Sequence, residues 1–426
     1  MASFSIPLTG LNADSIALNT IANDLSNMST TAFKAQTTNF SDLFYQQIGS
    51  TGSGDPIQVG AGTQVASTAT DFTVGTPNTT GVSSDVALQG GGFFVVDDGN
   101  TQYLTRAGDF QTDANGDLVT ANGLSVMGYP AANGVVNTNA PLTALNIPVG
   151  QVEAPQATTT MSMTANLDNE TAAGTQFPAE VTVYDSLGEA HVATVTYTPG
   201  AAANTWDYSV SLPAGDYAGA PPAPITGTMT FDANGNLAQV AQGAGPAQTV
   251  GTAAGDVSSI ALNFNGLADG ASNLAINWNL LGAAGTPTIS QVDTASAVSS
   301  TNQNGYASGQ YQSFSIGSDG TITASFSNGQ TLNVGQLALG NVVNLQGLQE
   351  LGNGDYATTL ASGTASIGTS GTAGLGAMEG GALESSNVNI SAEFSDLIVA
   401  QRAFEANAKS VTTFDTVTQD TINMVH

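Results

Sequence analysis

The feature that most constrains this chain is a long helical period near its C-terminal end. Ile390, Leu397, Phe404 and Val411 recur every seven residues, a spacing that keeps one apolar seam on one side of a helix. The intervening seam positions hold Phe394, Gln401 and Ala408, and the candidate N-caps are Ser385, Ser386 and Asn387. The period predicts a C-terminal helix over residues 381–426 whose seam needs an apolar partner.

A second helical period lies near the N-terminal end, over residues 8–28. Its seam comprises Leu11, Leu18, Ile21, Leu25 and Met28, and Asp14 interrupts it. Isolated helices of this length are marginal in water, so we expect the two terminal helices to pair as a coiled coil. The alternative, an ordinary core helix at each end of one domain, stays open on periodicity alone. Gln401 is predicted to bond across the helix pair or to a neighbouring chain and to help set register.

The chain between the helices carries strand signals. Short β-branched and aromatic runs alternate with Gly, Asn and Asp turns, which predicts antiparallel sheets in a sandwich or barrel. The predicted class is α+β and multidomain, with paired terminal helices and two nested antiparallel β-rich domains. The expected parts are an N-terminal axial helix (1–30), a connector (31–84), an inner β domain in two parts (85–146 and 298–380, the second with a connector), an outer inserted β domain (147–297) and a C-terminal axial helix (381–426).

The charge balance excludes several classes of partner. The 426 residues include 33 acids and only four bases, for a formal charge of −29. Nucleic acids and anionic membranes require Lys/Arg patches, so neither is expected as a partner. No run approaches the ~18 apolar residues of a membrane span, and the N-terminal segment lacks the pattern of a cleaved signal peptide. Cysteine is absent, which excludes disulfide and thiolate chemistry.

No catalytic, cofactor-binding or metal site is predicted. His191 is the one internal histidine, and it is expected to be structural or solvated. The repeated motifs beginning at Asp113 and Asp232 resemble calcium loops but lack the distant Glu, so they are predicted to be hairpin turns. The glycines at 90–92 precede no helix pattern, which argues against a phosphate loop. Asp97 and Asp98 also fall in a probable turn, and nothing favours a glycosidase pair there.

The few bases are Lys34, Arg106, Arg402 and Lys409. Lys34, Arg402 and Lys409 lie in or beside the terminal segments, so they are predicted to meet carboxylates of neighbouring segments. Glu405 is placed to pair with Arg402 and Lys409 along the helix. The alternative, that these charges only keep a helix face soluble, remains equally open.

Several motifs resemble those of the bacterial flagellar axial proteins, the family of rod, hook and filament-junction subunits. The terminal matches are LTGLNA at 8–13, IANDLSN at 21–27, TAFK at 31–34, GALESSNVN at 381–389 and IVAQRAFEAN at 398–407. Two internal matches are GFFVV at 92–96 and YLTRAGDF at 103–110. Three stretches resemble hook proteins in particular: VYDSLGEAH at 183–191, NQNGY at 302–306 and SNGQT at 327–331.

This resemblance implies a structural, non-enzymatic subunit. Its partners would be other copies of itself in a helical tube, the distal rod protein, the hook cap, the hook–filament junction proteins and the flagellar export apparatus. The tube would be a flexible joint outside the cell, attached to the basal body. The alternatives are a distal rod or other axial subunit, an extracellular β-rich adhesin and a surface hydrolase. We also expect terminal helices that fray in the monomer and order on assembly.

Overall fold

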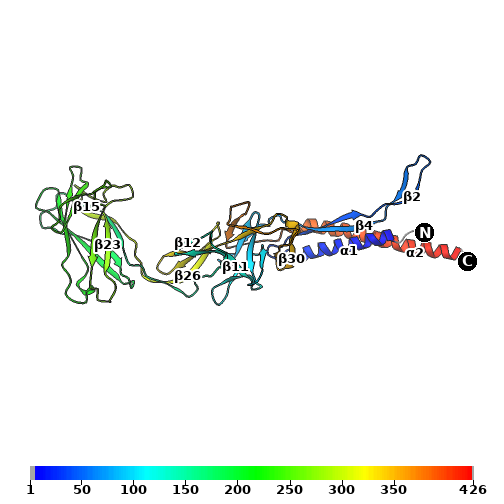
Figure 1. Ribbon diagram of the computed structural model, residues 1–426, viewed down its shortest axis with the longest axis horizontal. Helices are drawn as coiled ribbons and strands as arrows, with labels where there is room; N and C mark the ends of the chain where they lie inside the picture. Colours follow the sequence, from blue (N-terminus) through cyan, green and yellow to red (C-terminus); the bar gives the residue numbers. More distant parts are fainter. Residues whose placement is uncertain (1–4, 425–426) are drawn as a thin grey trace. The chain divides into compact units, whose positions relative to one another are not determined.

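The computed structural model describes residues 5–424 and contains two compact units (Figure 1). Unit 1 comprises residues up to 149 together with 313–325 and 331 onward, and unit 2 comprises 150–312 and 326–330. The expected boundary at 297/298 differs from this division. The strand β25 (Ala297–Gln303) pairs with β15 (Thr160–Asp168), which keeps residues 297–303 within the sheet of unit 2.

Two long helices belong to unit 1. The helix α1 (Ser5–Ser26) and the helix α2 (Ile390–Met424) run side by side (Figure 1). Asn389 caps α2, because its Oδ1 accepts bonds from the backbone N–H groups of Ser391 (3.1 Å) and Ala392 (3.3 Å). The expected cap at 385–387 is therefore wrong, and the helix begins nine residues after 381. Residues 377–384 instead form short strands.

The segment after α1 forms two antiparallel pairs of strands. Strand β1 (Gln36–Asp42) pairs with β4 (Thr63–Thr70), and β2 (Gln46–Ser50) pairs with β3 (Pro56–Val59). Residues 46–59, within the expected connector of 31–84, therefore form a hairpin. Gly54, with φ of 91°, provides the left-handed residue that its turn requires. Because β4 also lies against α1, this ribbon braces the helix.

The inner sheet of unit 1 follows the strand order β27-β28-β11-β7-β8-β31-β30. Phe93, Val95, Leu104, Tyr129 and Tyr356 belong to its buried core. The bounds of these strands are β7 (Phe93–Asp97), β8 (Gln102–Thr105), β11 (Ser125–Ala132), β27 (Thr321–Phe326), β28 (Thr331–Leu337), β30 (Gln349–Gly352) and β31 (Asp355–Ala357). Shorter members are β9 (Gln111–Thr112), β10 (Leu118–Val119), β12 (Val135–Val136), β13 (Thr143–Ala144), β29 (Leu339–Asn341) and β32 (Ser366–Gly368).

Two short ladders pair residues 77–89 with the segment that leads into α2. Strand β5 (Pro77–Thr79) pairs with β34 (Ala382–Glu384), and β6 (Val86–Gln89) pairs with β33 (Ala377–Gly380). Each ladder joins a segment near the N-terminal end to one just before α2. The two helices therefore leave the inner sheet from neighbouring positions.

Unit 2 is a sandwich of two sheets around one core. The six-stranded sheet has the order β16-β17-β18-β19-β20-β21, and the five-stranded sheet has the order β22-β23-β15-β24 with β25 on β15. Trp278, Tyr197 and Tyr208 are among its largest fully buried side chains. The strand bounds are β16 (Phe177–Tyr184), β17 (Ala190–Pro199), β18 (Thr205–Ser211), β19 (Ile225–Phe231), β20 (Leu237–Gln242), β21 (Gln248–Thr249), β22 (Ser259–Phe264), β23 (Leu274–Asn279) and β24 (Ile289–Val292). The remaining elements are β14 (Val152–Glu153), β26 (Gly309–Ile316), which continues into unit 1, and the short 3-10 helices η1 (Ala214–Asp216) and η2 (Leu345–Gly347) of units 2 and 1.

The expectation of a purely antiparallel outer domain is wrong at one place. Strand β15 runs parallel to β23 and β24. Parallel neighbours need a long crossover, and the whole six-stranded sheet lies between β15 and β23 in the chain. The six-stranded sheet itself is antiparallel throughout.

Candidate assembly surface

The buried face of α1 is made of small and polar residues. Gly10, Ala13, Ala17 and Asp24 are buried, whereas Leu11, Leu18, Ile21 and Leu25 are only half-buried. Helices that present small residues can approach closely, and α1 is packed against both α2 and the β1–β4 ribbon. The heptad of leucines therefore predicts the helix correctly but not the side that it buries most deeply.

One polar contact fixes how α1 meets α2. The Asn407 Nδ2 group donates a hydrogen bond to Asp14 Oδ2 at 2.8 Å. A Cβ atom at Gly10 would lie only 2.7 Å from the same Nδ2, so a larger residue there would force the Asn407 side chain to move. Asp14, which interrupts the apolar period, is thus the acceptor that positions α2. Sequence reasoning missed this role because a carboxylate in a seam has no visible partner until the other helix is placed.

The expected seam of α2 is largely accessible. Leu397 and Val411 are half-buried on the side of α1, but Ile390, Phe394, Gln401 and Phe404 are exposed. None of the 35 residues of α2, all of which the structure describes, is buried. Phe394 and Ile398 retain 52% and 57% of their accessible surface. The face toward α1 follows Glu393, Ala400, Asn407 and Phe414 instead, which is a second heptad series of mixed polarity.

Gln401 makes no hydrogen bond across the helix pair within residues 5–424, and its side chain is exposed. The within-chain half of the prediction for Gln401 is therefore wrong, and a bond to a neighbouring chain stays a prediction. Asn407, six residues later, has the position that faces α1.

A buried ion cluster connects both helices to the inner sheet. Lys34 Nζ lies 2.6 Å from Glu384 Oε1, and Arg106 Nε lies 3.4 Å from Glu384 Oε2, with all three side chains almost fully buried. Lys34 follows α1, Glu384 precedes α2, and Arg106 belongs to the inner sheet region. Burial lowers the pKa of Lys34, and the hydrogen bond that Lys34 donates to Glu384 opposes that shift. Removing one member of such a buried cluster leaves an uncompensated charge, at a cost of roughly 3–5 kcal/mol.

The glycine-rich segment at 90–92 serves this cluster. Arg106 Nη1 donates to the carbonyl oxygens of Gly90 and Gly92, each at 2.8 Å. Its guanidinium carbon also lies 5.8 Å from the centre of the Phe93 ring. Gly90 and Gly92 have φ of 118° and 108°, which only glycine adopts readily. These glycines therefore shape a cradle for the Arg106 guanidinium.

Two further residues, Asn387 and Asp24, make hydrogen bonds near the start of α2 and the end of α1. Asn387 Oδ1 accepts from the backbone N–H of Ala35 at 2.8 Å, and its Nδ2 donates to the carbonyl oxygen of Asp71 at 2.8 Å. Asp24 Oδ2 accepts from the backbone N–H of Gln36 at 2.9 Å, and burial raises the pKa of this carboxyl. Asn387, expected as a cap, therefore fastens the start of α2 to the segment that follows α1.

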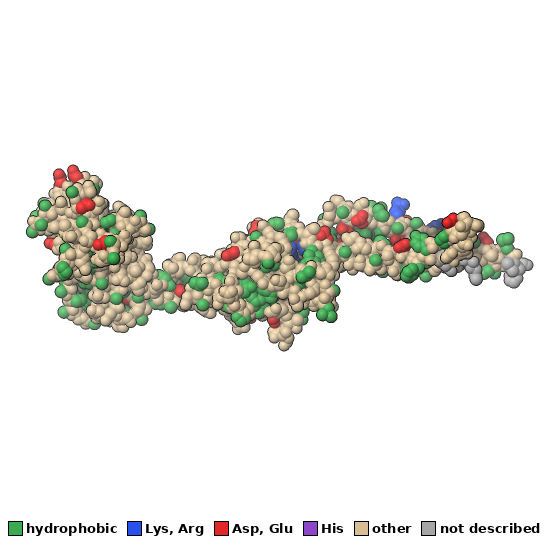
Figure 2. Space-filling model, turned by 45° about the horizontal axis from the view of Figure 1, so that its top comes forward, with side chains coloured by type: hydrophobic (Ala, Val, Ile, Leu, Met, Phe, Trp, Pro, Cys, Tyr) green, Lys and Arg blue, Asp and Glu red, His purple; other side chains and the backbone are tan. Residues whose placement is uncertain are grey.

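Lys34 confirms the expectation that a terminal base meets a carboxylate, but Arg402 and Lys409 do not. Both are exposed, and neither lies within 4.0 Å of a carboxylate oxygen in the described part of the chain. The helical pairs with Glu405 are likewise not formed at ion-pair distance. Figure 2 shows Lys or Arg side chains standing at the surface among a largely uncharged background.

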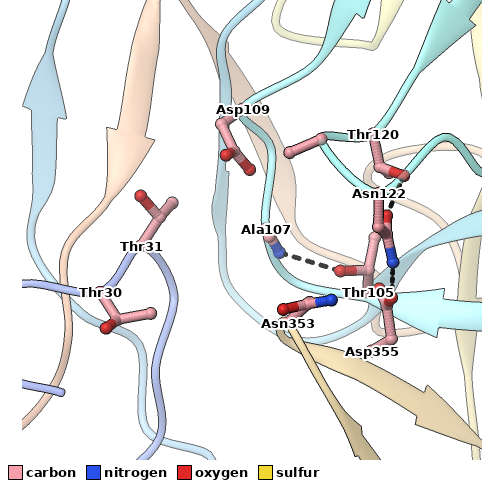
Figure 3. A pocket seen from close by; sticks show the side chains of 10 residues that line it. Thr30, Thr31, Thr105, Ala107, Asp109, Thr120, Asn122, Asn353 and Asp355 are labelled. Atoms are coloured by element: carbon pink, nitrogen blue, oxygen red, sulfur yellow. Dashed lines mark hydrogen bonds between the residues drawn. The ribbon is translucent and has the colours of Figure 1, made fainter.

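A polar cleft of about 350 Å³ opens beside the loop that follows α1 (Figure 3). Thr30 and Thr31 form one wall, and Asp109 and Asp355 belong to the other. Asp355 Oδ2 accepts from Asn122 Nδ2 at 2.6 Å, and burial raises the pKa of both carboxyls. Among the other described lining residues, the backbone N–H of Ala107 donates to Thr105 Oγ1 and the Thr120 hydroxyl donates to Asn122 Oδ1.

The sequence predicts that His191 is either structural or solvated. The structure shows a structural histidine within unit 2. The imidazole is buried, with Nδ1 at 2.8 Å from Asp216 Oδ2 and Nε2 at 3.3 Å from Asp185 Oδ2. Although desolvation opposes the charged form, the bonds to Asp216 and Asp185 raise the pKa of His191. Asp185, His191 and Asp269 could in principle hold a metal, since their ligand atoms lie within 4.8 Å of one another. Because both ring nitrogens already face carboxylates, the geometry fits a protonated imidazole better than a metal ligand.

The repeated Asp-Ala-Asn-Gly motifs form the expected hairpin turns. Asp113 Oδ1 accepts from the N–H groups of Asn115 and Asp117, and Asp232 Oδ1 does the same for Asn234 and Asn236. These donors lower the pKa of both carboxyls. Asp97 and Asp98 also lie at a turn, between β7 and β8. Within residues 5–424, no helix is long and apolar enough to cross a membrane.

Comparison with known proteins agrees with this architecture. Three family models match: the flagellar basal body protein FlaE D2 domain over residues 152–306, the flagellar hook protein FlgE/F/G D1 domain over 87–166 and the flagellar basal body rod FlgEFG protein C-terminal model over 379–424. The chain is therefore of the rod and hook class of flagellar proteins.

Relatives that match over the whole length of the chain identify the member of this class more closely. The flagellar hook proteins FlgE of Treponema pallidum and Escherichia coli are each 33% identical, covering 100% and 99% of this chain and 99% and 100% of the relatives. The crystal structure of Helicobacter pylori flagellar hook protein FlgE2 shares the fold, with a TM-score of 0.51, 15% identity, and coverage of 71% of this chain and 99% of that one. The chain belongs to the flagellar hook protein family and is a structural subunit of the hook.

Proposed function

We propose that this subunit polymerises through its terminal helices into a hollow helical tube, the flexible joint that transmits torque from rod to filament. The observation that carries the proposal is the accessible α2. A helix of 35 residues that buries no side chain, yet exposes Ile390, Phe394, Ile398 and Val399, has apolar surface still to bury. Each such side chain contributes ~1.5–3 kcal/mol when it is fully covered.

Under this proposal, α1 and α2 form a coiled coil and the two β units are nested between them. Unit 1 contains both ends of the described chain while unit 2 is continuous apart from residues 326–330, which supports the nesting. The seam for assembly comprises Leu11, Leu18, Ile21, Leu25, Ile390, Phe394, Leu397, Gln401, Phe404 and Val411. Leu397 and Val411 serve mainly within the pair, and the exposed members of α2 serve contacts between copies.

The finer partners and location are also proposals. The subunit would reach the exterior through the flagellar export apparatus. At its ends the polymer would meet the distal rod protein, the hook cap and the hook–filament junction proteins. Subunits exported unfolded need no disulfides, and this chain has no cysteine.

Deletion of residues 390–426 tests the proposal. The truncated chain is expected to remain a soluble monomer with both β units folded, and to form no tubes by electron microscopy or sedimentation. Tubes formed by the truncated protein would show that α2 is not the polymerisation element.

A further inference from the structure

The exposed positive charges of the helix pair all lie on α2. Two of the four bases of the chain, Lys34 and Arg106, are buried with Glu384. The only exposed Lys or Arg side chains are therefore Arg402 and Lys409, both on α2. They lie seven residues apart, which places them on the same face of the helix.

A groove of about 370 Å³ runs between α1, β1 and α2. Asp14, Glu393 and Asp396 line it together with apolar side chains that include Ile21 and Val399. Within residues 5–424, no Lys, Arg or His lies within 4.0 Å of these three carboxylates. Burial raises the pKa of Glu393, and repulsion from Asp24 and Asp396 adds to the shift. The groove thus gathers carboxylates that form no ion pair within the described part of the chain.

Within residues 5–424, the two bases of α2 form no ion pair with the groove of their own chain. Arg402 is nine residues beyond Glu393, about two and a half helical turns, and therefore lies opposite Glu393 around α2. Ile398, one turn before Arg402, exposes 57% of its surface next to that face. The outer face of α2 thus combines a cation with an apolar side chain, which is the complement of the groove.

We propose that the outer face of α2 docks into the α1–β1–α2 groove of a second copy of this chain, with Arg402 bound to Glu393 and Asp396 and Ile398 on the apolar lining. The inference rests on the proposed self-assembly and deepens it. A guanidinium can bind a carboxylate through two hydrogen bonds, which sets orientation as well as attraction. Lys409 strengthens the attraction from the next turns.

This contact explains why assembly continues rather than closing. The groove and the cationic face lie on different sides of the same helix, so each copy offers both surfaces at once. Such heterologous contacts give open helical assemblies when the rotation does not close a ring. The second copy is the favoured occupant because the pairing needs a surface with isolated cations in an acidic background, which this chain itself provides.

Charge-swap variants of the full-length protein test the pairing. Arg402→Glu and Asp396→Arg are each expected to raise the critical concentration for polymerisation, measured by sedimentation, by at least about tenfold, equivalent to 1.4 kcal/mol. An equimolar mixture of the two variants, and the double variant R402E/D396R, are expected to recover polymer, because each restores opposite charges across the contact. Glu170→Arg, an exposed acid of unit 2, is the matched control and should leave the critical concentration unchanged.

Polymerisation of R402E at the wild-type critical concentration would overturn the pairing, and so would loss in both single variants without recovery in the mixture and the double variant. Thermal unfolding of the monomers checks that each variant keeps the wild-type β units. The deletion of residues 390–426 separates this inference from the proposed function. If that deletion abolishes tubes while R402E does not, self-assembly through α2 stands and the Arg402 contact fails.

Discussion

The helix pair of unit 1 and the sandwich of unit 2 use side chains in opposite ways. Unit 2 buries large apolar residues such as Trp278, Tyr197 and Leu167 within one continuous core. The helix pair buries Gly10, Ala13, Ala17 and Asp24 on α1 and nothing on α2 within the described residues. Area buried within one chain dominates folding stability, so the sandwich should be stable alone, and under the proposed assembly the helices complete their burial only in a polymer. The proposal therefore separates folding from assembly along the sequence.

The largest expected contrast compares core substitutions in the two regions. Trp278→Ala should destabilise unit 2 by about 3–5 kcal/mol, because it leaves a cavity in a fully buried site. The Leu397 side chain on α2 is only half-buried, so Leu397→Ala should change the free energy of unfolding of the monomer by less than about 1 kcal/mol. Denaturant unfolding of the monomers measures both values. Equal losses for the two variants would show that the helix pair is a folded core in its own right.

The buried ion cluster should give the next largest effect. Glu384→Gln removes the carboxylate between Lys34 and Arg106 and leaves two buried cations uncompensated, so unit 1 should lose roughly 3 kcal/mol or more. Hydrogen exchange should show faster opening of residues 32–36 and 382–388, with unit 2 unaffected. Glu405→Gln, on exposed α2, is the control and should be neutral. A neutral E384Q would mean that the cluster does not hold the helices to the sheet.

The pH dependence of unit 2 should follow His191 and Asp185. The pKa of His191 is raised by its carboxylate partners, so its contribution is present below its unfolded pKa of about 6.5 and is lost as pH rises through the folded value. The pKa of Asp185 is lowered, so its contribution is present above about 3.9 and is lost as pH falls through the folded value. Unit 2 should therefore be most stable in mildly acidic solution, by Tm against pH. His191→Gln should remove the decline on the alkaline side; an unchanged profile would exclude His191 as its source.

The smallest expected effect is that of Gly10→Ala at the contact between α1 and α2, where the direction of the change in stability is informative. Helix propensity alone predicts that Gly10→Ala stabilises α1 by up to about 1 kcal/mol. The steric contact with Asn407 Nδ2 predicts instead that it loosens the α1–α2 pair. We expect a raised critical concentration for Gly10→Ala, and recovery in the double variant with Asn407→Ala that removes the clash. Improved assembly of Gly10→Ala alone would show that Asn407 moves aside freely.

Much of the architecture could be predicted from local patterns. Period seven located both helices, alternation such as Ala179, Val181 and Val183 located the half-buried strands, and Asp113 marked a hairpin turn. What local patterns could not provide was partnership between distant segments. Lys34, Arg106 and Glu384 meet across 350 residues, and Asp14 meets Asn407 across 393. The parallel pairing of β15 is of the same kind, because it depends on which strand returns beside it.

Prediction from the sequence was also limited in telling which face of each helix is buried. A heptad of Leu and Phe predicts an apolar seam, but it does not say whether that seam faces the same chain or another copy. In this subunit the contact within the chain follows the small and polar series of Gly10, Asp14 and Asn407. The conspicuous apolar series of α2 is exposed in part, and only Leu397 and Val411 among its large side chains are half-buried. The most hydrophobic period was therefore a poor guide to what the single chain buries.

Hydrogen exchange of α2 in monomer and polymer tests the central claim most directly. The amides of residues 390–424 should exchange rapidly in the monomer, while the strands of unit 2 are strongly protected, because exchange reports local opening. In the polymer, α2 should become protected to the level of those strands. Strong protection of α2 already in the monomer would contradict the claim that assembly, rather than folding of the single chain, completes this helix.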